Sequence, residues 1–269
     1  MTPFSFLHLT DIHIVAPGRG ELYGLHPAAR LAEAVESIAR RHGPGGPAPA
    51  SFAVITGDLA HWGEPEAYAV LAQELARLPI PYYLLIGNHD DRTAFRVAFP
   101  QAPVDEAGFV QRSLKTLVGR FLLLDTNESG THAGRYCERR LAWLSAQLAE
   151  DEEPVFLFLH HPPVRVGIHR MDSIPLLDAA GLWEVLRPHR ERIRHLFHGH
   201  LHRPLAGSWH GIPTSSLRGT AHQVALDLAE RETVPGSHEP PAYALVRVTE
   251  EDVVVHTHDF LSEAPAFHL

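Results

Sequence analysis

Cysteine is almost absent from this chain of 269 residues, which contains only Cys137. A single cysteine cannot form a disulfide within the chain, and it excludes zinc sites built from pairs of cysteines. Long apolar runs are also missing, because the longest runs, such as 155–159, have about five residues where a membrane helix needs about 20. Since 45% of the residues are nevertheless apolar, the composition predicts a folded protein without a membrane-spanning helix.

Positive charge is scarce as well. The chain has 23 Lys and Arg residues against 32 Asp and Glu residues, which gives a net charge of −9 with neutral histidines. Such a field repels nucleic acid, so long nucleic acids are not expected as partners. Residues 1–9 lack the basic region, the long apolar segment and the cleavage site of a secretory signal, and a cytoplasmic location is therefore expected.

Short apolar runs alternate with helical patterns, which is typical of an α/β fold. No internal repeat or clear boundary interrupts the alternation, so a single domain over residues 1–269 is expected. The expected strands are 4–9, 52–56, 82–86, 110–114, 121–125, 155–159, 195–197, 212–216, 223–228, 242–248 and 253–258. The expected helices are 27–41, 65–77, 138–148 and 176–188. Strands after residue 205 are expected to pair antiparallel.

Histidine is the residue in excess, with 21 copies, and it is the commonest metal ligand in proteins. Potential ligands directly follow five of the expected strands. Because ligands bind beyond the carboxyl ends of strands in open α/β sheets, we expect these groups to converge in space. The five groups are Asp11-Ile12-His13, Gly57-Asp58, Gly87-Asn88-His89-Asp90, His160-His161 and His198-Gly199-His200-Leu201-His202.

The donor types in these groups suit a pair of metal ions. Carboxylate oxygens, an amide oxygen and imidazole nitrogens together favour zinc, manganese, iron or cobalt over calcium. Asp58 has two carboxylate oxygens and can bridge two ions. Gly57 and Gly87 leave no side chain beside the ligands, which permits sharp turns and a close approach of the backbone.

The order of these groups resembles the calcineurin-like metallophosphoesterase superfamily. Its pattern is D-x-H, G-D, G-N-H-[DE], H and G-H-x-H, and all five blocks occur here in that order between residues 11 and 202. The stretches 20–24, 63–68, 171–172 and 219–224 most resemble bacterial glycerophosphodiester phosphodiesterases and class III cyclic-nucleotide phosphodiesterases. The resemblance implies a four-layer α/β/β/α sandwich with mixed sheets, in which strands from about 205–269 complete the second sheet. It also implies a dimer or larger homo-oligomer, with those strands as a plausible interface.

The resemblance also implies roles for individual residues. Two divalent or trivalent transition-metal ions, of manganese, iron, zinc or cobalt, would be held by seven residues. His89 would be the catalytic acid or charge stabiliser, and Asp90 would orient its imidazole. One ion would be bound by Asp11, His13, Asp58 and His202, and the other by Asp58, Asn88, His160 and His200.

Other polar residues receive weaker expectations. His161, His198 and His222 are further candidates near the site, and Tyr23 and Trp62 could shape its entrance. A substrate pocket could include Arg165, His169 and Asp172. The histidines outside the five blocks are expected to have no catalytic part. They include His8, His42, His61, His132, His189, His195, His210, His238, His256, His258 and His268.

The expected activity is metal-dependent hydrolysis of small phosphodiesters, either 3′,5′-cyclic nucleotides such as cAMP or glycerophosphodiesters, by a metal-activated hydroxide. A phosphomonoesterase or a nuclease on the same scaffold is the alternative. Position 86 is Ile86 where protein Ser/Thr phosphatases have Arg, which disfavours that class. A non-catalytic interaction scaffold is a third possibility, but such scaffolds typically lack catalytic residues that are present here.

Overall fold

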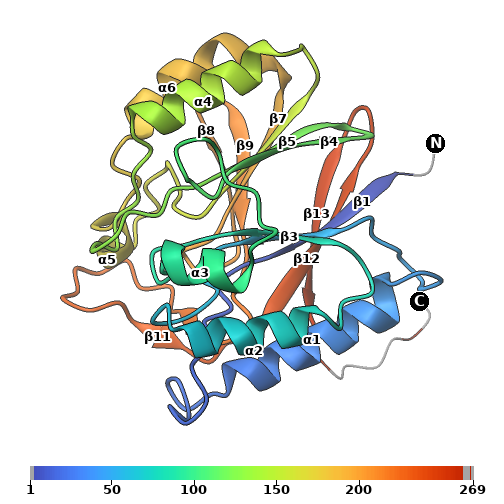
Figure 1. The fold of residues 1–269 in the computed structure, drawn as a ribbon, viewed down its shortest axis with the longest axis vertical. Helices are drawn as coiled ribbons and strands as arrows, with labels where there is room; N and C mark the ends of the chain where they lie inside the picture. The colour runs from blue at the N-terminus through green and yellow to red at the C-terminus, as the bar shows by residue number, and fades with distance from the viewer. Residues whose placement is uncertain (1–2, 263–266, 268–269) are drawn as a thin grey trace.

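Two β-sheets pack face to face between two layers of helices (Figure 1) in the computed structural model, which describes residues 3–262 and 267. The four layers confirm the predicted α/β/β/α sandwich. The first sheet has the strand order β13 (Val253–Asp259), β12 (Ala242–Val248), β1 (Phe4–Leu9), β2 (Ala53–Thr56) and β3 (Tyr82–Leu85). The second has the order β4 (Arg112–Thr116), β5 (Gly119–Leu124), β6 (Val155–Leu159), β7 (Ile193–His198), β9 (Ile212–Ser216) and β8 (Leu205–Trp209).

Helices cover the outer face of each sheet. The first sheet is covered by α1 (Pro27–His42), α2 (Pro65–Leu75) and α3 (Arg92–Ala98), which share a hydrophobic core with β1 and β2. The second is covered by α4 (Glu138–Ala149) and α6 (Ala179–Leu186), followed by the 3-10 helix η1 (Arg187–Arg192). A short helix, α5 (His169–Asp172), lies in the connection after β6.

Aromatic side chains fill the space between the sheets. Phe6 of β1 packs edge-to-face against Phe121 of β5, with ring centroids 4.9 Å apart, and Phe158 stacks on Phe197 at 4.9 Å. All four rings are fully buried, and each contributes about 1.5–3 kcal/mol of hydrophobic stabilisation. This core holds the two sheets in a fixed relation, so loops from both can build one site.

Parallel strands bring the functional loops together. β1, β2 and β3 run parallel in the first sheet, as do β5, β6, β7 and β9 in the second. Their carboxyl ends therefore lie at a common edge of each sheet.

Most of the predicted elements are confirmed within one to three residues. The sequence missed α3, α5 and the edge strand β8. The antiparallel pairing expected after residue 205 is confirmed for β8 with β9 and for β12 with β13. The expectation that these strands complete the second sheet is wrong, because β8 and β9 join the second sheet, whereas β12 and β13 join the first. β10 (Gln223–Val224) and β11 (Gly236–Ser237) form a small separate ladder, and positions 263–266 and 268–269 lie outside the described residues. No helix in the described part of the chain could cross a membrane.

Candidate metal centre

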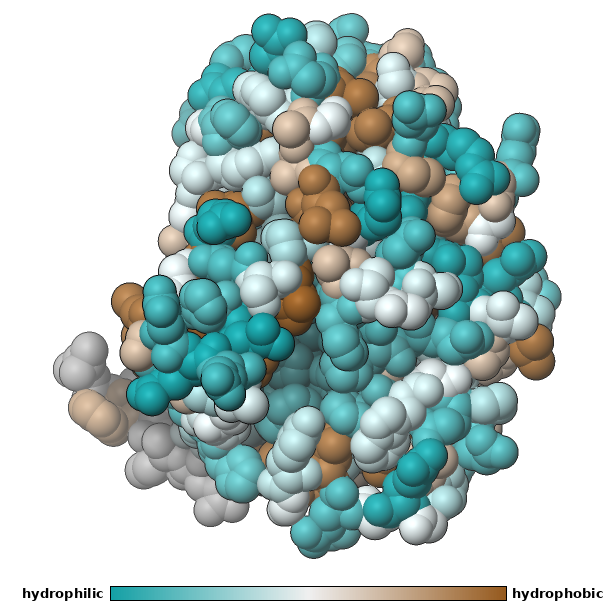
Figure 2. All heavy atoms as spheres, turned by 90° about the vertical axis from the view of Figure 1, so that its left-hand side faces the viewer, coloured by the Kyte–Doolittle hydropathy of each residue, from teal (hydrophilic) through white to brown (hydrophobic). Residues whose placement is uncertain are grey.

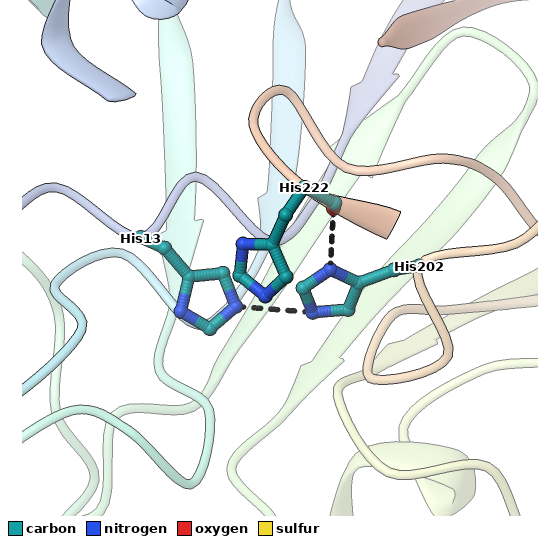
Figure 3. Close-up of side chains that lie close together, drawn as sticks. All are labelled: His13, His202 and His222. Carbon is teal, nitrogen blue, oxygen red and sulfur yellow. Dashed lines mark hydrogen bonds between the residues drawn. The ribbon is translucent and has the colours of Figure 1, made fainter. Parts of the chain in front are cut away.

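The seven predicted ligands all lie on loops that follow the carboxyl ends of parallel strands. Four of them, contributed by three loops, place one donor atom each within 4.8 Å of one another. His13 Nε2 lies 3.5 Å from Asp58 Oδ2, and His202 Nε2 lies 3.3 Å from Asp11 Oδ1. The Nε2 atoms of His13 and His202 are 3.0 Å apart (Figure 3). These are the four residues that the sequence assigned to the first ion.

The second predicted set adjoins the first through Asp58. Oδ2 of Asp58 lies 3.3 Å from His160 Nε2, which is 3.1 Å from Asn88 Oδ1. The ring of His200 lies 5.2 Å from that of His160, centroid to centroid. Asp58 thus faces ligands of both sets, as a bridging carboxylate must.

The backbone turns sharply at these residues. Five of the seven candidate ligands have left-handed φ angles between 46° and 70°, a region where Asp and His are tolerated but most residues are rare. Such strain concentrates at functional sites. The five are Asp11, His13, Asp58, His200 and His202. Gly57, at φ +95°, has no room for a side chain, because a Cβ atom there would lie 2.7 Å from Gly87 N and from His160 Nδ1.

Hydrogen bonds fix which ring nitrogen faces the cluster. His160 Nδ1 donates to the carbonyl of Thr56 at 2.7 Å, and His202 Nδ1 donates to the carbonyl of His222 at 2.8 Å (Figure 3). In both rings this leaves the Nε2 lone pair for a metal. His161 differs, because its Nδ1 contacts Thr126 Oγ1 at 2.8 Å and its Nε2 contacts the carbonyl of His132 at 3.2 Å. The geometry therefore favours His160 over His161 as the ligand.

Burial perturbs the pKa of several groups in the cluster. Burial lowers the pKa of His13 and of His200 well below the usual value, so both rings are neutral. Burial raises the pKa of Asp11. Burial also raises the pKa of Asp58, but the nearby charges of His160 and His89 outweigh burial and hold this pKa well below its usual value. The neutral rings of His13 and His200 and the ionised Asp58 are in the protonation states that metal ligands require. His160 differs, because burial lowers its pKa but the adjacent Asp58 carboxylate outweighs burial and raises it to about 9, so this ring has to lose a proton when it binds a metal.

One buried atom tests whether metal ions fit. Asp11 Oδ2 is shielded from solvent and has no hydrogen-bond partner among the described residues. A buried carboxylate oxygen without a partner is costly unless a cation satisfies it. Together with the oxygen and imidazole donors around it, this atom fits a site for divalent metal ions.

His89 and Asp90 follow Asn88 but face different surroundings. The main-chain N–H of His89 donates to Asp58 Oδ1 at 2.9 Å, and its Nδ1 donates to the carbonyl of His61 at 2.8 Å. Nε2 is thereby left as the free ring nitrogen of a side chain that lines the cavity.

The expectation that Asp90 orients the His89 imidazole is wrong. The Asp90 carboxylate accepts hydrogen bonds from the main-chain N–H groups of Leu59, Ala60 and Gly87, and from the hydroxyl of Tyr68. It therefore ties the Asp58 loop to the Asn88 loop. Burial, reinforced by the nearby charge of Asp58, raises the pKa of Asp90 to about 6.

A cavity of about 600 Å³ opens above the cluster. Its wall includes residues of α5 and β11, and Figure 2 shows a hollow with mostly hydrophilic walls on the face where these elements lie. Two predicted candidates line it, Tyr23 and His222; the rings of His222 and His202 have centroids 4.6 Å apart. Arg170, which was not predicted, also lines the cavity.

Other candidates lie away from this wall. Asp172 accepts main-chain hydrogen bonds from Val166 and Gly167, so it orders its own loop. Asp172 is not among the described residues that line the cavity. The same is true of four further candidates, namely Trp62, Arg165, His169 and His198.

Of the histidines that were expected to be inert, three line the cavity, His61, His132 and His238, and the first two contact candidate ligands. His61 Nδ1 lies 3.0 Å from His13 Nδ1, and His132 Nδ1 lies 2.9 Å from Asn88 Nδ2. The sequence held one weak signal for His61, which is the third residue after Asp58. The sequence contained no such signal for His132, because its loop contacts Asn88 only in the folded chain.

Comparison with known proteins identifies a family to which the chain is similar. The model of the calcineurin-like phosphoesterase family matches residues 4–204. The chain is 47% identical over 269 residues, covering 98% of this chain and 96% of the relative, to a probable cyclic nucleotide phosphodiesterase of Rhodopseudomonas palustris. It is 31% identical over 207 residues, 76% of each chain, to a probable glycerophosphodiester phosphodiesterase of Arcobacter nitrofigilis.

A solved structure shows the same fold. A dimetal phosphatase of Danio rerio matches with a TM-score of 0.70 at 16% identity, over 96% of each chain. The family match includes all five ligand blocks, since they end at His202. This chain belongs to the calcineurin-like phosphoesterase family.

Proposed function

We propose that the protein is a dimetal phosphodiesterase that hydrolyses small phosphodiesters, with 3′,5′-cyclic nucleotides as the favoured class. The observation that carries the proposal is the position of Asp58 between two adjoining ligand sets, at the floor of a cavity. One ion would be held by Asp11, His13, Asp58 and His202, and the other by Asp58, Asn88, His160 and His200. Manganese, zinc, iron and cobalt all suit these donors.

The bound metals would supply a hydroxide near neutral pH and would neutralise charge on the phosphate oxygens. The chain's own residues perform the rest. His89 donates a hydrogen bond from its Nδ1–H to the carbonyl of His61, so the proton for the leaving oxygen has to be carried on Nε2, with the ring in its imidazolium form. Asp90 positions both loops through main-chain hydrogen bonds rather than exchanging protons with substrate. Tyr23 and His222 form the wall above the metal ligands.

Arg170 supports cyclic nucleotides over diesters with a cationic alcohol. Its side chain lines the cavity, and within the described residues it has no ion-pair partner; its Nε atom is buried without a hydrogen bond. A free guanidinium repels a choline or ethanolamine group but tolerates an uncharged nucleoside. The relative that is 47% identical carries the name of a cyclic nucleotide phosphodiesterase, which agrees with this choice. A homo-oligomer and a cytoplasmic location remain predictions from the sequence.

Hydrolysis by metal-free protein with each metal added back tests the proposal. Bis(p-nitrophenyl) phosphate should be cleaved faster than p-nitrophenyl phosphate, and cyclic AMP or cyclic GMP faster than glycerophosphoethanolamine. Asn88→Ala should abolish the activity, whereas His256→Ala, at an exposed position of β13, should leave it unchanged.

Faster cleavage of the monoester would show that the protein is a phosphomonoesterase rather than a phosphodiesterase. Preference for glycerophosphoethanolamine would overturn the choice of cyclic nucleotides. Inactivity with every metal would favour a scaffold role.

A further inference from the structure

A main-chain hydrogen bond fixes the position of His61 in the site. It follows β2, and its main-chain N–H donates to the carbonyl of Ile14 at 2.8 Å, which joins the loop after β2 to the loop after β1. Its side chain is only 6% exposed. The residue is therefore fixed between the loop that carries His13 and the loop that carries Asp58.

Two different groups of His61 contact two different functional residues. Its ring Nδ1 lies 3.0 Å from Nδ1 of His13, and its carbonyl oxygen accepts a hydrogen bond from Nδ1 of His89 at 2.8 Å. The rings of His61 and His89 also stack, with centroids 4.7 Å apart and planes 22° apart.

The contact with His13 has a defined direction once His13 binds a metal. Nε2 of His13 faces Asp58 and His202, so Nε2 is the ligating atom and Nδ1 must carry the proton. That proton needs an acceptor, and the nearest described one is the Nδ1 atom of His61. Metal-bound histidines usually donate this hydrogen bond to a carboxylate or a carbonyl oxygen, whereas here an imidazole nitrogen would accept it.

We propose that His61 is a positioning residue that fixes His13 through its ring and His89 through its carbonyl, so that one residue aligns a metal ligand with the proton donor. The part that concerns His89 rests on the proposed function. The part that concerns His13 does not, because metal binding can be measured without a substrate.

The same atoms could instead suggest that His61 is itself a ligand, since His13, His61 and His89 each place one nitrogen within 4.8 Å of the others. The contacts argue against this. Nδ1 of His89 is already bonded to the His61 carbonyl, and the stacked rings present their faces, rather than their nitrogen lone pairs, to each other.

Three variants of His61 separate these roles. In asparagine, the side-chain oxygen can occupy the place of Nδ1, whereas in glutamine the terminal group reaches the place of Nε2. All three variants keep the main-chain carbonyl that His89 uses. We expect His61→Ala and His61→Gln to weaken the binding of Mn²⁺ by about 10–100-fold, the usual cost of losing a partner of a metal ligand. His61→Asn should bind within about threefold of the parent.

The measurement is competition for Mn²⁺ between the protein and a chelator, with the number of bound ions recorded. At saturating Mn²⁺, the kcat of the alanine and glutamine variants should fall far less than their affinity does, and the kcat of the asparagine variant should stay close to that of the parent, because His89 keeps its hydrogen bond. His256→Asn serves as a surface control, and far-UV circular dichroism reports folding. If His61→Ala does not fold, the comparison of the asparagine and glutamine variants still decides the question.

Equal affinity in the alanine variant and the parent, or equal loss in the asparagine and glutamine variants, would overturn the proposal. A loss of one bound ion in all three variants would make His61 a ligand instead. Failure of the parent to hydrolyse any phosphodiester would refute the proposed function but leave the metal-affinity result intact.

Discussion

Adding one methyl group at Gly87 should disable the metal centre without unfolding the protein. Gly87 lies directly beneath Asp58, where a Cβ atom would be 2.5 Å from Asp58 N and 2.7 Å from His160 Cε1, and closer still to Asp58 Oδ1. Gly87 does not have a left-handed φ angle, so Gly87→Ala adds a steric conflict and little backbone strain.

The size of the displacement follows from these distances. Cβ atoms essentially never approach another atom closer than 3.0 Å, so the new Cβ atom and Asp58 N must separate by at least 3.0 − 2.5 = 0.5 Å. The bridging carboxylate has to move as well. Misplacement of about 1 Å in a catalytic group costs about 10²-fold in rate, and overpacking a buried site costs about 1–3 kcal/mol of stability. We therefore expect kcat/KM to fall about 10²-fold while the variant stays folded.

Gly207→Ala is the matched control. Gly207 lies in β8, where a new Cβ atom would meet nothing closer than 3.8 Å. Both variants are compared by urea unfolding, by competition for Mn²⁺ with a chelator, and by hydrolysis of bis(p-nitrophenyl) phosphate. If Gly87→Ala matches Gly207→Ala within threefold in metal affinity and in kcat/KM, the steric reasoning is refuted.

Three further changes test other parts of the site. His89→Ala should lower kcat by about 10²–10⁴-fold with Mn²⁺ affinity nearly unchanged, and a parallel loss of affinity would contradict a role as proton donor. Arg170→Gln should increase kcat/KM for glycerophosphoethanolamine relative to cyclic AMP by roughly tenfold, as competition between the two substrates would show; an unchanged ratio would remove Arg170 from substrate choice. Burial, followed by the nearby His198 and His195, lowers the pKa of His8 to about 3, so the folded state keeps this ring neutral where the unfolded state takes up a proton. The free energy of unfolding should therefore fall as pH drops from 6.5 towards 3. In urea unfolding of metal-free protein, the parent should lose about 1.4 kcal/mol per pH unit more than His8→Gln. Equal loss of stability per pH unit in the two proteins would contradict a neutral, buried His8.

The sequence predicts strands well where they are buried on both faces. The run 155–159 has apolar residues at every position and matches β6 at both ends. In β8, by contrast, three of five residues are exposed and one is Gly207, so neither composition nor alternation distinguishes the strand from a loop. The short helix α3 begins directly after the Asn88 loop, where Asp91 caps it by accepting a hydrogen bond from Ala94 N. That signal is local and was overlooked beside the ligand block.

The site is predictable to the extent that its residues follow strand ends. His13 and His200 could be found because strand order places each loop at the same edge. His132 could not, because its contact with Asn88 spans 44 positions and depends on how the loop after β5 folds back. For Asp90, closeness in the sequence was misleading. Its place next to His89 suggested that its carboxylate orients the His89 ring, but the carboxylate contacts the Tyr68 hydroxyl, whereas the ring contacts the His61 carbonyl.

The left-handed φ angles of five proposed ligands would make metal binding and folding depend on each other. Each such residue costs about 1–2 kcal/mol relative to ordinary backbone, somewhat less for Asp and His, so five of them represent several kcal/mol in a protein whose net stability is about 5–15 kcal/mol. Glycine adopts these φ angles without strain. Selection for stability alone would therefore favour glycine at positions such as Asp11 and His202. Under the proposed function, bound metal ions would offset this backbone strain. A substitution that relaxes these turns to raise the thermal stability would therefore weaken metal binding and lower the activity.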